Sequence, residues 1–290
     1  MSLPAGYSQV GAHPHELAIG FEPLDALRGG RVGTPLRFEI EGPRPLPAAT
    51  EGASYHRQSG PGPLRPVIDR HDSCLYALLY HQVQPYTQPP QQLPMPLAGL
   101  VNLRIYDHRR RFVPRRFAVP LPPLLGENDP PRAQRVRRPL LFPGAACELS
   151  SRATGIRARV LRAGAPLRWT RVEATLAGGE VVGRAHGDDR GEFLLVLDPS
   201  AAPAVELVDP LSVRVTVYAP AVAPLPLPPD LLAQDFLWDL PLESLPAPGA
   251  PDLVSTGEQL PAGYVKTAGS SRLVPFRLGR LISVPDFVFA

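Results

Sequence analysis

The 290-residue chain has little of what catalysis or metal binding requires. Its two cysteines, Cys74 and Cys147, are too few and too far apart for a zinc site or a disulfide framework, so we expect both to be small hydrophobic residues. A GxGxxG motif, a Walker loop, a GxSxG elbow and a carboxylate pair at a catalytic spacing are all missing. The sequence therefore predicts a protein that is not an enzyme and that uses no catalytic residue, cofactor or metal.

Long apolar runs and a targeting pattern are missing as well. No run approaches the length of about 18 apolar residues that marks a membrane span. The N-terminal residues contain neither the basic region nor the apolar region of a signal peptide. We therefore expect a cytoplasmic protein without a membrane span, which would leave the cell only as part of a released particle.

Proline, in contrast, is abundant, with 39 residues spread along the chain. Each interior proline removes a helical hydrogen bond and clashes with the preceding turn, so long helices are disfavoured. The length is that of about two domains. Composition and length together favour an all-β protein with two cores.

Short alternating strands bounded by turn residues are predicted in the second half. Residues 156–161 and 172–176 are expected to form a strand and its return strand. The stretch VVGRAHGDDRGEFLLVL, residues 181–197, predicts two strands around a tight turn, and residues 211–218 alternate like a half-buried antiparallel strand. Five or more such strands indicate a β-sandwich.

This region resembles the carboxypeptidase regulatory-like, or transthyretin-like, β-sandwich. The pattern of that family is a strand, a variable hairpin and then Asp-x-x-Gly-x-Phe/Tyr opening the next strand, which Asp188, Gly191 and Phe193 match position by position. The resemblance implies that the aspartate caps the turn by accepting backbone N–H bonds and that the glycine has a conformation unfavourable to other residues. It also implies an accessory or interaction module without a conserved catalytic residue.

His186, Asp188 and Asp189 also raise the alternative of a metal site. Zinc needs three or four converging ligands, and a calcium loop needs more oxygens than two aspartates supply, so the turn is favoured over the metal. His186 alternates with Arg184 and is expected on the solvent face. His13 and His15 could chelate a metal as a pair, but no Asp, Cys or further His lies near them in sequence, and they are expected to be solvated.

A fainter copy of the same order can be traced in the first half. Three stretches mirror the later strands: residues 19–27 with 35–41, residues 71–80, and residues 100–106. In the middle stretch Asp72 and Tyr76 fit the family pattern, but Cys74 and Leu75 occupy the place of the glycine. His71, Asp72 and Ser73 are the residue types of a hydrolase triad, but strand neighbours point to opposite faces and form no relay.

These patterns predict an all-β fold with two transthyretin- or Ig-like β-sandwich domains and Pro-rich extended arms. The expected parts are an N-terminal arm (1–15), a first sandwich with long loop insertions (16–125), an Arg- and Pro-rich linker (126–143), the carboxypeptidase regulatory-like sandwich (144–222) and a Pro-rich C-terminal arm that ends in short strands (223–290).

An arginine-rich strip covers residues 104–138, where ten arginines stand against three acidic residues. It could bind phosphates, contact the carboxylates of other subunits, or be a solvated turn. Aromatic residues for base stacking are sparse, so protein contact is favoured over nucleic acid. The candidate contact residues are Arg109, Arg110, Arg111, Arg135, Arg137 and Arg138.

The C-terminal segment, residues 273–290, is apolar up to its last residue, although free chain ends are usually polar. We expect it to pair as a strand or to lie in a groove, in its own chain or in a neighbour. The contact candidates here are Phe276, Leu278, Phe287 and Phe289.

The function expected from these features is that of a non-enzymatic scaffold subunit of a multi-subunit bacterial assembly. Chains of this composition with transthyretin-like modules are similar to accessory components of contractile injection systems and phage-tail-like particles. Other subunits or further copies of the chain are the expected partners. One alternative is a carbohydrate- or surface-ligand-binding protein, with Tyr76, Tyr80 and Tyr86 as candidate aromatics; the other is nucleic-acid binding through the arginine-rich strip.

Overall fold

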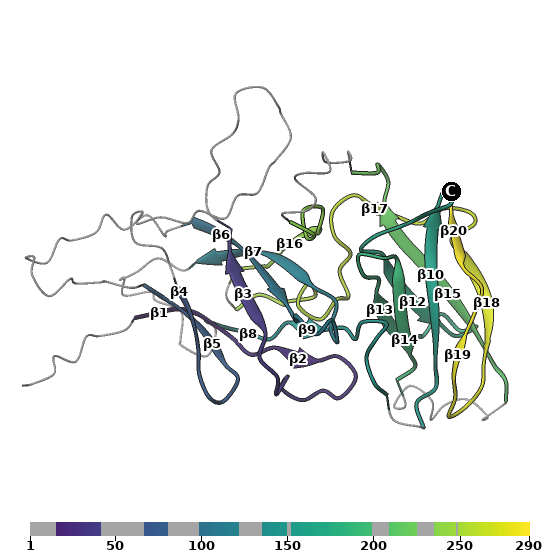
Figure 1. Cartoon of the computed structure of the whole chain (residues 1–290), viewed down its shortest axis with the longest axis horizontal. Helices are drawn as coiled ribbons and strands as arrows, with labels where there is room; N and C mark the ends of the chain where they lie inside the picture. Colours follow the sequence, from purple (N-terminus) through teal and green to yellow (C-terminus); the bar gives the residue numbers. More distant parts are fainter. Residues whose placement is uncertain are drawn as a thin grey trace, which may run out of the picture.

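The computed structural model describes residues 16–41, 67–80, 99–121, 135–149, 152–198, 209–224, 235–247 and 249–290. Within them the chain forms twenty strands, and the all-β prediction is confirmed (Figure 1). Among these residues no helix has the length and apolar character needed to cross a bilayer. The predicted N-terminal arm, with His13 and His15, and Tyr86 lie outside the described residues.

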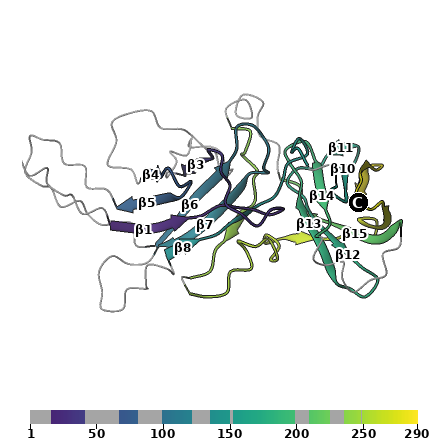
Figure 2. The same ribbon diagram turned by 90° about the horizontal axis from the view of Figure 1, so that it is seen from below.

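The first sheet pair encloses one core. Its two sheets have the strand orders β4-β5-β1-β8 and β16-β7-β6-β3, and β2 pairs with β9 beside them. Seen from below, the sheet of β1 and β5 lies across that of β6 and β7 (Figure 2). The strands are β1 (Glu16–Phe21), β2 (Leu24–Asp25), β3 (Arg37–Ile40), β4 (Val67–Arg70), β5 (Tyr76–Tyr80), β6 (Gly99–Tyr106), β7 (Arg115–Leu121), β8 (Val136–Arg137), β9 (Leu140–Leu141) and β16 (Leu242–Ser244). Alternation brings Ile19 and Leu78 from one sheet against Leu103 and Phe117 from the other.

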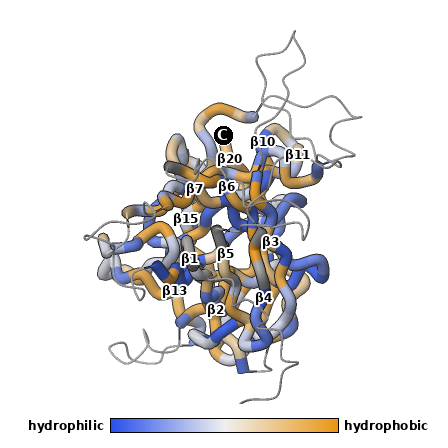
Figure 3. The backbone as a smooth tube through the Cα atoms, turned by 90° about the vertical axis from the view of Figure 1, so that its left-hand side faces the viewer, coloured by the Kyte–Doolittle hydropathy of each residue, from blue (hydrophilic) through white to orange (hydrophobic). Residues whose placement is uncertain are grey.

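The second sheet pair encloses a separate core. One sheet centres on β10, which pairs with β11, β14, β19 and β20, and the other runs β13-β12-β15 with β17 and β18 beside β15. The strands are β10 (Gly155–Arg162), β11 (Ala165–Pro166), β12 (Arg171–Thr175), β13 (Val181–His186), β14 (Glu192–Val196), β15 (Leu211–Pro220), β17 (Tyr264–Val265), β18 (Ser271–Phe276), β19 (Leu281–Ser283) and β20 (Phe287–Phe289). Ile156, Phe193, Val215 and Phe276 fill the space between the sheets. Figure 3, seen from the side of the first sheet pair, shows apolar and polar residues mixed along the chain, as is usual for sheets with one covered face.

The two sheet pairs repeat one pattern of strand pairing. The order β5-β1-β8 recurs as β14-β10-β19, with an antiparallel and then a parallel neighbour in both cases. The order β7-β6-β3 recurs as β18-β15-β12, antiparallel throughout. The strand correspondence suspected from the sequence is therefore matched by the pairing. β4 and β13 are the exception, since β4 is in the sheet of β5 whereas β13 is in the sheet of β12.

The predicted first hairpin of each half is wrong. Residues 156–161 lie in β10 and residues 172–176 largely in β12, but these strands belong to different sheets. The return strand of β10 is only the two-residue β11, after which the chain crosses to the other sheet. In the first half β1 and β3 are separated in the same way, since β1 pairs with β5 and β3 with β6.

The predicted linker and C-terminal arm also need correction. The described part of the linker, residues 135–143, contains β8 and β9, which pair with β1 and β2. After β15 the chain returns to the first sheet pair, where β16 adds to β7 in parallel, and then it comes back to supply β17 to β20 (Figure 1). The first sheet pair therefore contains strands that precede β10 and a strand that follows β15. The second contains strands that precede β16 and strands that follow it.

Candidate functional site

The turn between β13 and β14 has the geometry expected of Asp188 and Gly191. Asp188 Oδ1 accepts the backbone N–H groups of Arg190 at 2.8 Å and Glu192 at 2.9 Å. Gly191 has a φ of +73°. Phe193, which opens β14, is completely buried in the second core. In the part of the chain that the structure describes, no three His, Cys, Asp or Glu residues are placed to hold a metal ion.

The equivalent turn in the first sheet pair precedes β5, but its alignment differs by one residue from the predicted one. His71, not Asp72, occupies the place of Asp188, because its Nδ1 accepts the N–H of Ser73 at 3.1 Å and its own N–H donates to Leu75. Cys74 occupies the place of Gly191 with a φ of +61°. This thiol is half-buried in a turn, whereas Cys147 is buried as expected.

A third turn of this kind joins β6 to β7. Asp107 accepts the N–H groups of Arg109 at 2.9 Å and Arg111 at 3.3 Å, and Arg110 has a φ of +55°. Phe112 follows in the position of Phe193. The residue pattern does not reveal this copy, because an arginine, and not a glycine, has the left-handed conformation.

Substitution of Gly191 should destabilise the protein beyond the cost of its φ alone. A Cβ there would approach Val160 O at 2.8 Å, and Gly191→Val also strains the backbone by about 1 to 3 kcal/mol. Gly179→Val is the matched control, because Gly179 has a φ of +85° and open space around it. Cys74→Gly should instead stabilise by about 1 kcal/mol. Urea unfolding measures the stability of all three variants. Equal losses of stability in Gly191→Val and Gly179→Val would show that the close approach to Val160 adds no cost.

The two sheet pairs meet at a buried ion network, and we call this contact region the joint. Glu243 on β16 binds Arg115 on β7 with oxygen–nitrogen distances of 2.6 and 3.0 Å, and it binds Arg171 on β12 at 3.1 Å. None of the three side chains is more than 5% exposed. Arg115 also donates to three backbone carbonyls, those of Leu140, Val254 and Ser255. Burial raises the pKa of Glu243, but Arg115 and Arg171 outweigh it and hold this pKa below its ordinary value.

His186 lies in the joint, and its predicted place in solvent is wrong. It does alternate with Ala185, which faces the second core, but on the outer face of β13 it packs against Phe142, which follows β9 of the first sheet pair. The imidazole is 1% exposed and stacks on Phe142 with 3.9 Å between ring centroids. Burial lowers its pKa well below the ordinary value, and the charges of Arg171 and Arg115 lower it further.

Stability should therefore fall in mild acid through His186. The unfolded chain binds the proton near pH 6.5, while the folded chain keeps the imidazole neutral, so this contribution is complete above that pH and is lost as pH decreases, by up to about 1.4 kcal/mol per unit. Urea unfolding between pH 7.5 and pH 5 should show this slope. His186→Gln should have a shallower slope, and an unchanged slope in that variant would contradict the assignment.

A cleft of about 220 Å³ opens beside the joint. The Asp107–Phe112 turn and the Asp188–Phe193 turn face each other across it, and Arg110 Nη1 reaches Asp189 Oδ1 at 3.1 Å. Trp169 forms part of the wall, with its Nε1–H bound to Asp239 at 2.7 Å. The lining residues are Asp107, His108, Arg110, Phe112, Val113, Pro114, Gly144, Trp169, Asp188, Asp189 and Phe236.

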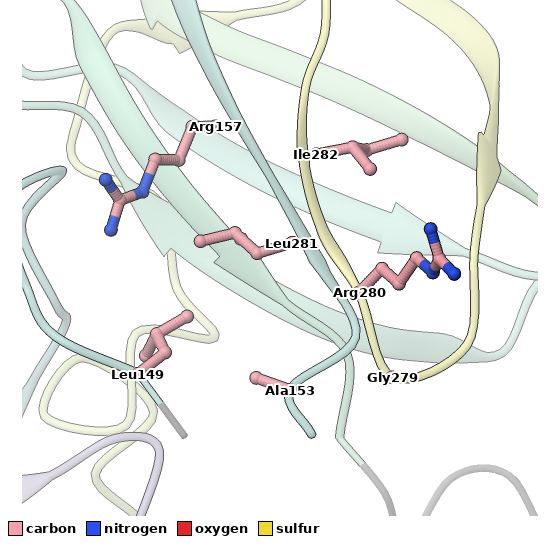
Figure 4. Close-up of a pocket in the computed structure, with 7 residues that line it drawn as sticks. All are labelled: Leu149, Ala153, Arg157, Gly279, Arg280, Leu281 and Ile282. Carbon is pink, nitrogen blue, oxygen red and sulfur yellow. The ribbon is translucent and has the colours of Figure 1, made fainter. Parts of the chain in front are cut away.

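A larger hollow of about 580 Å³ lies beside β19. Its two arginines, Arg157 and Arg280, extend to opposite sides of Leu281 and do not converge on a common point (Figure 4). One of them, Arg157, donates to the carbonyl of Cys147 at 3.0 Å. The hollow therefore lacks the converging polar groups that orient a ligand. It is lined by Leu149, Ala153, Arg157, Gly279, Arg280, Leu281 and Ile282.

The arginine-rich strip is not one surface. Arg135 and Arg137 are buried, and Arg137 donates to the carbonyl of Pro246. Arg138 is exposed and pairs with Glu22, whereas Arg111 pairs with Asp107. Of the six candidates, Arg109 and Arg110 are also exposed. Because the sheet pairing distributes these side chains among different carboxylates and carbonyls, a continuous phosphate-binding patch is not formed by the described arginines.

The C-terminal aromatic residues fill the core of their own chain. Phe276, Phe287 and Phe289 are 0 to 2% exposed in the second core, while Leu278 lies partly exposed in the turn before β19. Of the two predicted locations for this segment, its own chain is the one observed, so these phenylalanines are not available to a neighbour. Tyr76, a candidate for carbohydrate stacking, is also in a core, at 3% exposure, with its hydroxyl accepting the N–H of Leu36. The side chain of Tyr80 lies outside the described set.

Comparison with known proteins adds no family. No family model matches the chain, and no curated protein matches it. A solved structure with partial similarity is a 9R-lipoxygenase from Cyanothece PCC8801, at 14% identity and a TM-score of 0.23. The match covers 49% of this chain and 17% of that one, and a likeness of this size carries no argument about fold or function.

Proposed function

We propose that the chain is a non-enzymatic structural subunit of a multi-subunit bacterial assembly, of the kind found in contractile injection systems and phage-tail-like particles. In this proposal the two sheet pairs are two transthyretin- or Ig-like β-sandwich domains, the second of the carboxypeptidase regulatory-like type. The chain is made in the cytoplasm, and its partners are other subunits. The repeated strand pairing and the repeated left-handed turn support the domain assignment.

The observation that carries the proposal is the joint. Arg115 and Glu243 come from one sheet pair and Arg171 from the other, and together they are buried. A buried charge network tolerates little change in geometry, because separating the partners leaves uncompensated charges without water. The segment that carries β16 also ties the pairs together, since it enters the first pair and leaves it again. Two modules held at a fixed angle suit a subunit that sets the spacing between its neighbours.

Fractionation of the native host tests the proposal. An N-terminally tagged chain should sediment with a fraction far heavier than a 290-residue monomer. Mass spectrometry should find a constant set of other subunits in that fraction, and electron microscopy should show tail-like particles in it. The same tag on an unrelated cytoplasmic protein is the control. Recovery of the chain only as a monomer or small homo-oligomer, under every condition of growth, would overturn the proposal.

A further inference from the structure

The cleft beside the joint lies between two copies of one turn, and the copies differ at the position with positive φ. In the Asp188 turn this residue is Gly191, and in the Asp107 turn it is Arg110, at +55°. A left-handed conformation is costly for arginine and almost free for glycine. The Arg110 side chain therefore occupies the cleft from a backbone position where the turn itself favours glycine.

The lining of the cleft is suited to a cation with a flat face. Three aspartates line it, and two of them, Asp107 and Asp188, are committed to backbone N–H groups of their own turns. Asp189 makes one ion pair among the described residues, with Arg110. Phe236 is 46% exposed, and its ring lies 5.8 Å from the Arg110 guanidinium carbon. Asp189 and Phe236 thus bind the charge and the face of one guanidinium group.

The volume of the cleft also restricts the occupant. Small-molecule pockets commonly measure about 300 to 1,000 Å³, and this cleft, at about 220 Å³, is smaller. It accommodates a side chain better than a cofactor. An arginine fits better than a lysine, because a planar guanidinium can stack on Phe236 while it donates to a carboxylate.

We propose that this cleft is the docking site for an arginine side chain of a partner subunit, and that Arg110 is its resident competitor. The Arg110 side chain is 50% exposed and that of Asp189 is 19% exposed, so their ion pair is weak and can be displaced. The partner arginine replaces Arg110 on Asp189 and Phe236. This inference rests on the proposed function, because a partner subunit must supply the arginine.

The test uses the full chain with N-acetyl-arginine amide as the probe. Arg110→Gly vacates the cleft and suits the local φ, so this variant should fold. We expect it to bind the probe at least tenfold more tightly than the wild type, and N-acetyl-lysine amide at least threefold more weakly than the arginine probe. Fluorescence of Trp169 in the cleft wall, or calorimetry, reports binding. Arg109→Gly is the matched control in the same turn and should bind the probe as the wild type does.

Asp189→Asn added to Arg110→Gly should abolish the gain. Equal binding by the single and double variants, or no saturable binding by Arg110→Gly, would overturn the inference. An Arg110→Gly dimer that the probe dissociates would also overturn it, by assigning the cleft to a second copy of the chain. Binding of the probe does not require the assembly. If the probe fails to bind but the chain co-sediments with other subunits, the proposed arginine site is refuted and the proposed function is not. Probe binding by a chain that never joins a particle refutes the proposed function alone.

Discussion

Truncation after Ser271 is expected to unfold the protein. It removes β19, β20 and all but the first residue of β18, and with them Val274, Phe276, Phe287 and Phe289, none more than 3% exposed. Each such side chain contributes about 1.5 to 3 kcal/mol when fully buried, so the four together contribute about 6 to 12 kcal/mol. That is comparable with the whole stability of a domain. Circular dichroism should show loss of the cooperative thermal transition, and expression should yield aggregates.

Outward-facing residues of the same strands provide the control. Leu273 on β18 is 62% exposed and Val288 on β20 is 63% exposed, although each stands next to a core residue. The double variant Leu273→Ser and Val288→Ser should keep its melting temperature within a few degrees of the wild type. A truncated chain that unfolds cooperatively at the wild-type temperature would show that the second core does not need its C-terminal strands.

Glu243→Gln is expected to cost about 3 to 5 kcal/mol, since it leaves Arg115 and Arg171 buried without their counter-charge. The substitution keeps the shape of the side chain, so the loss reports charge and not packing. Urea unfolding should show the decrease in the free energy of unfolding. Glu173→Gln is the matched control: its ion pair with Arg184 is 3.7 Å long and about one-third exposed, and its removal should cost less than about 1 kcal/mol.

Replacement of the whole network separates the two effects of its charges. Arg115→Met, Glu243→Leu and Arg171→Met together remove every charge and retain bulk, and such replacements are often neutral or stabilising. We expect the triple variant to be more stable than Glu243→Gln by several kcal/mol. If the free energy of unfolding of Glu243→Gln lay within about 1 kcal/mol of the wild-type value, this would show that water reaches the joint.

The sequence predicts those features of the fold that depend on neighbouring residues. Alternation located most strands, and the Asp188 turn follows from residue types within six positions. Strand partners were not predictable in the same way. β10 pairs with β14 and β12 with β15, and in both cases other strands lie between the partners in the sequence. Alternation also assigned His186 to the outer face of its sheet, but the sequence does not show that another sheet pair covers this face.

The joint could not be predicted for the same reason. Glu243 lies 128 residues from Arg115 and 72 from Arg171 along the chain, and no local pattern links them. One signal was available: Glu243 is the single acid in the stretch LPLESLPAP, residues 240–248, which contains β16 and is otherwise apolar apart from Ser244. A charge in an apolar strand of this kind calls for a buried partner.

The return path of the chain also has a consequence for biosynthesis. β7 ends at residue 121 and β16 begins at residue 242, so β7 leaves the ribosome long before the strand that pairs with it. The second sheet pair cannot close before β20, at residues 287–289, has been made. Domains that are continuous in sequence fold one after another as they emerge, but here neither core can close early. The strand edges of the nascent chain therefore need protection until β16 and β20 have been made.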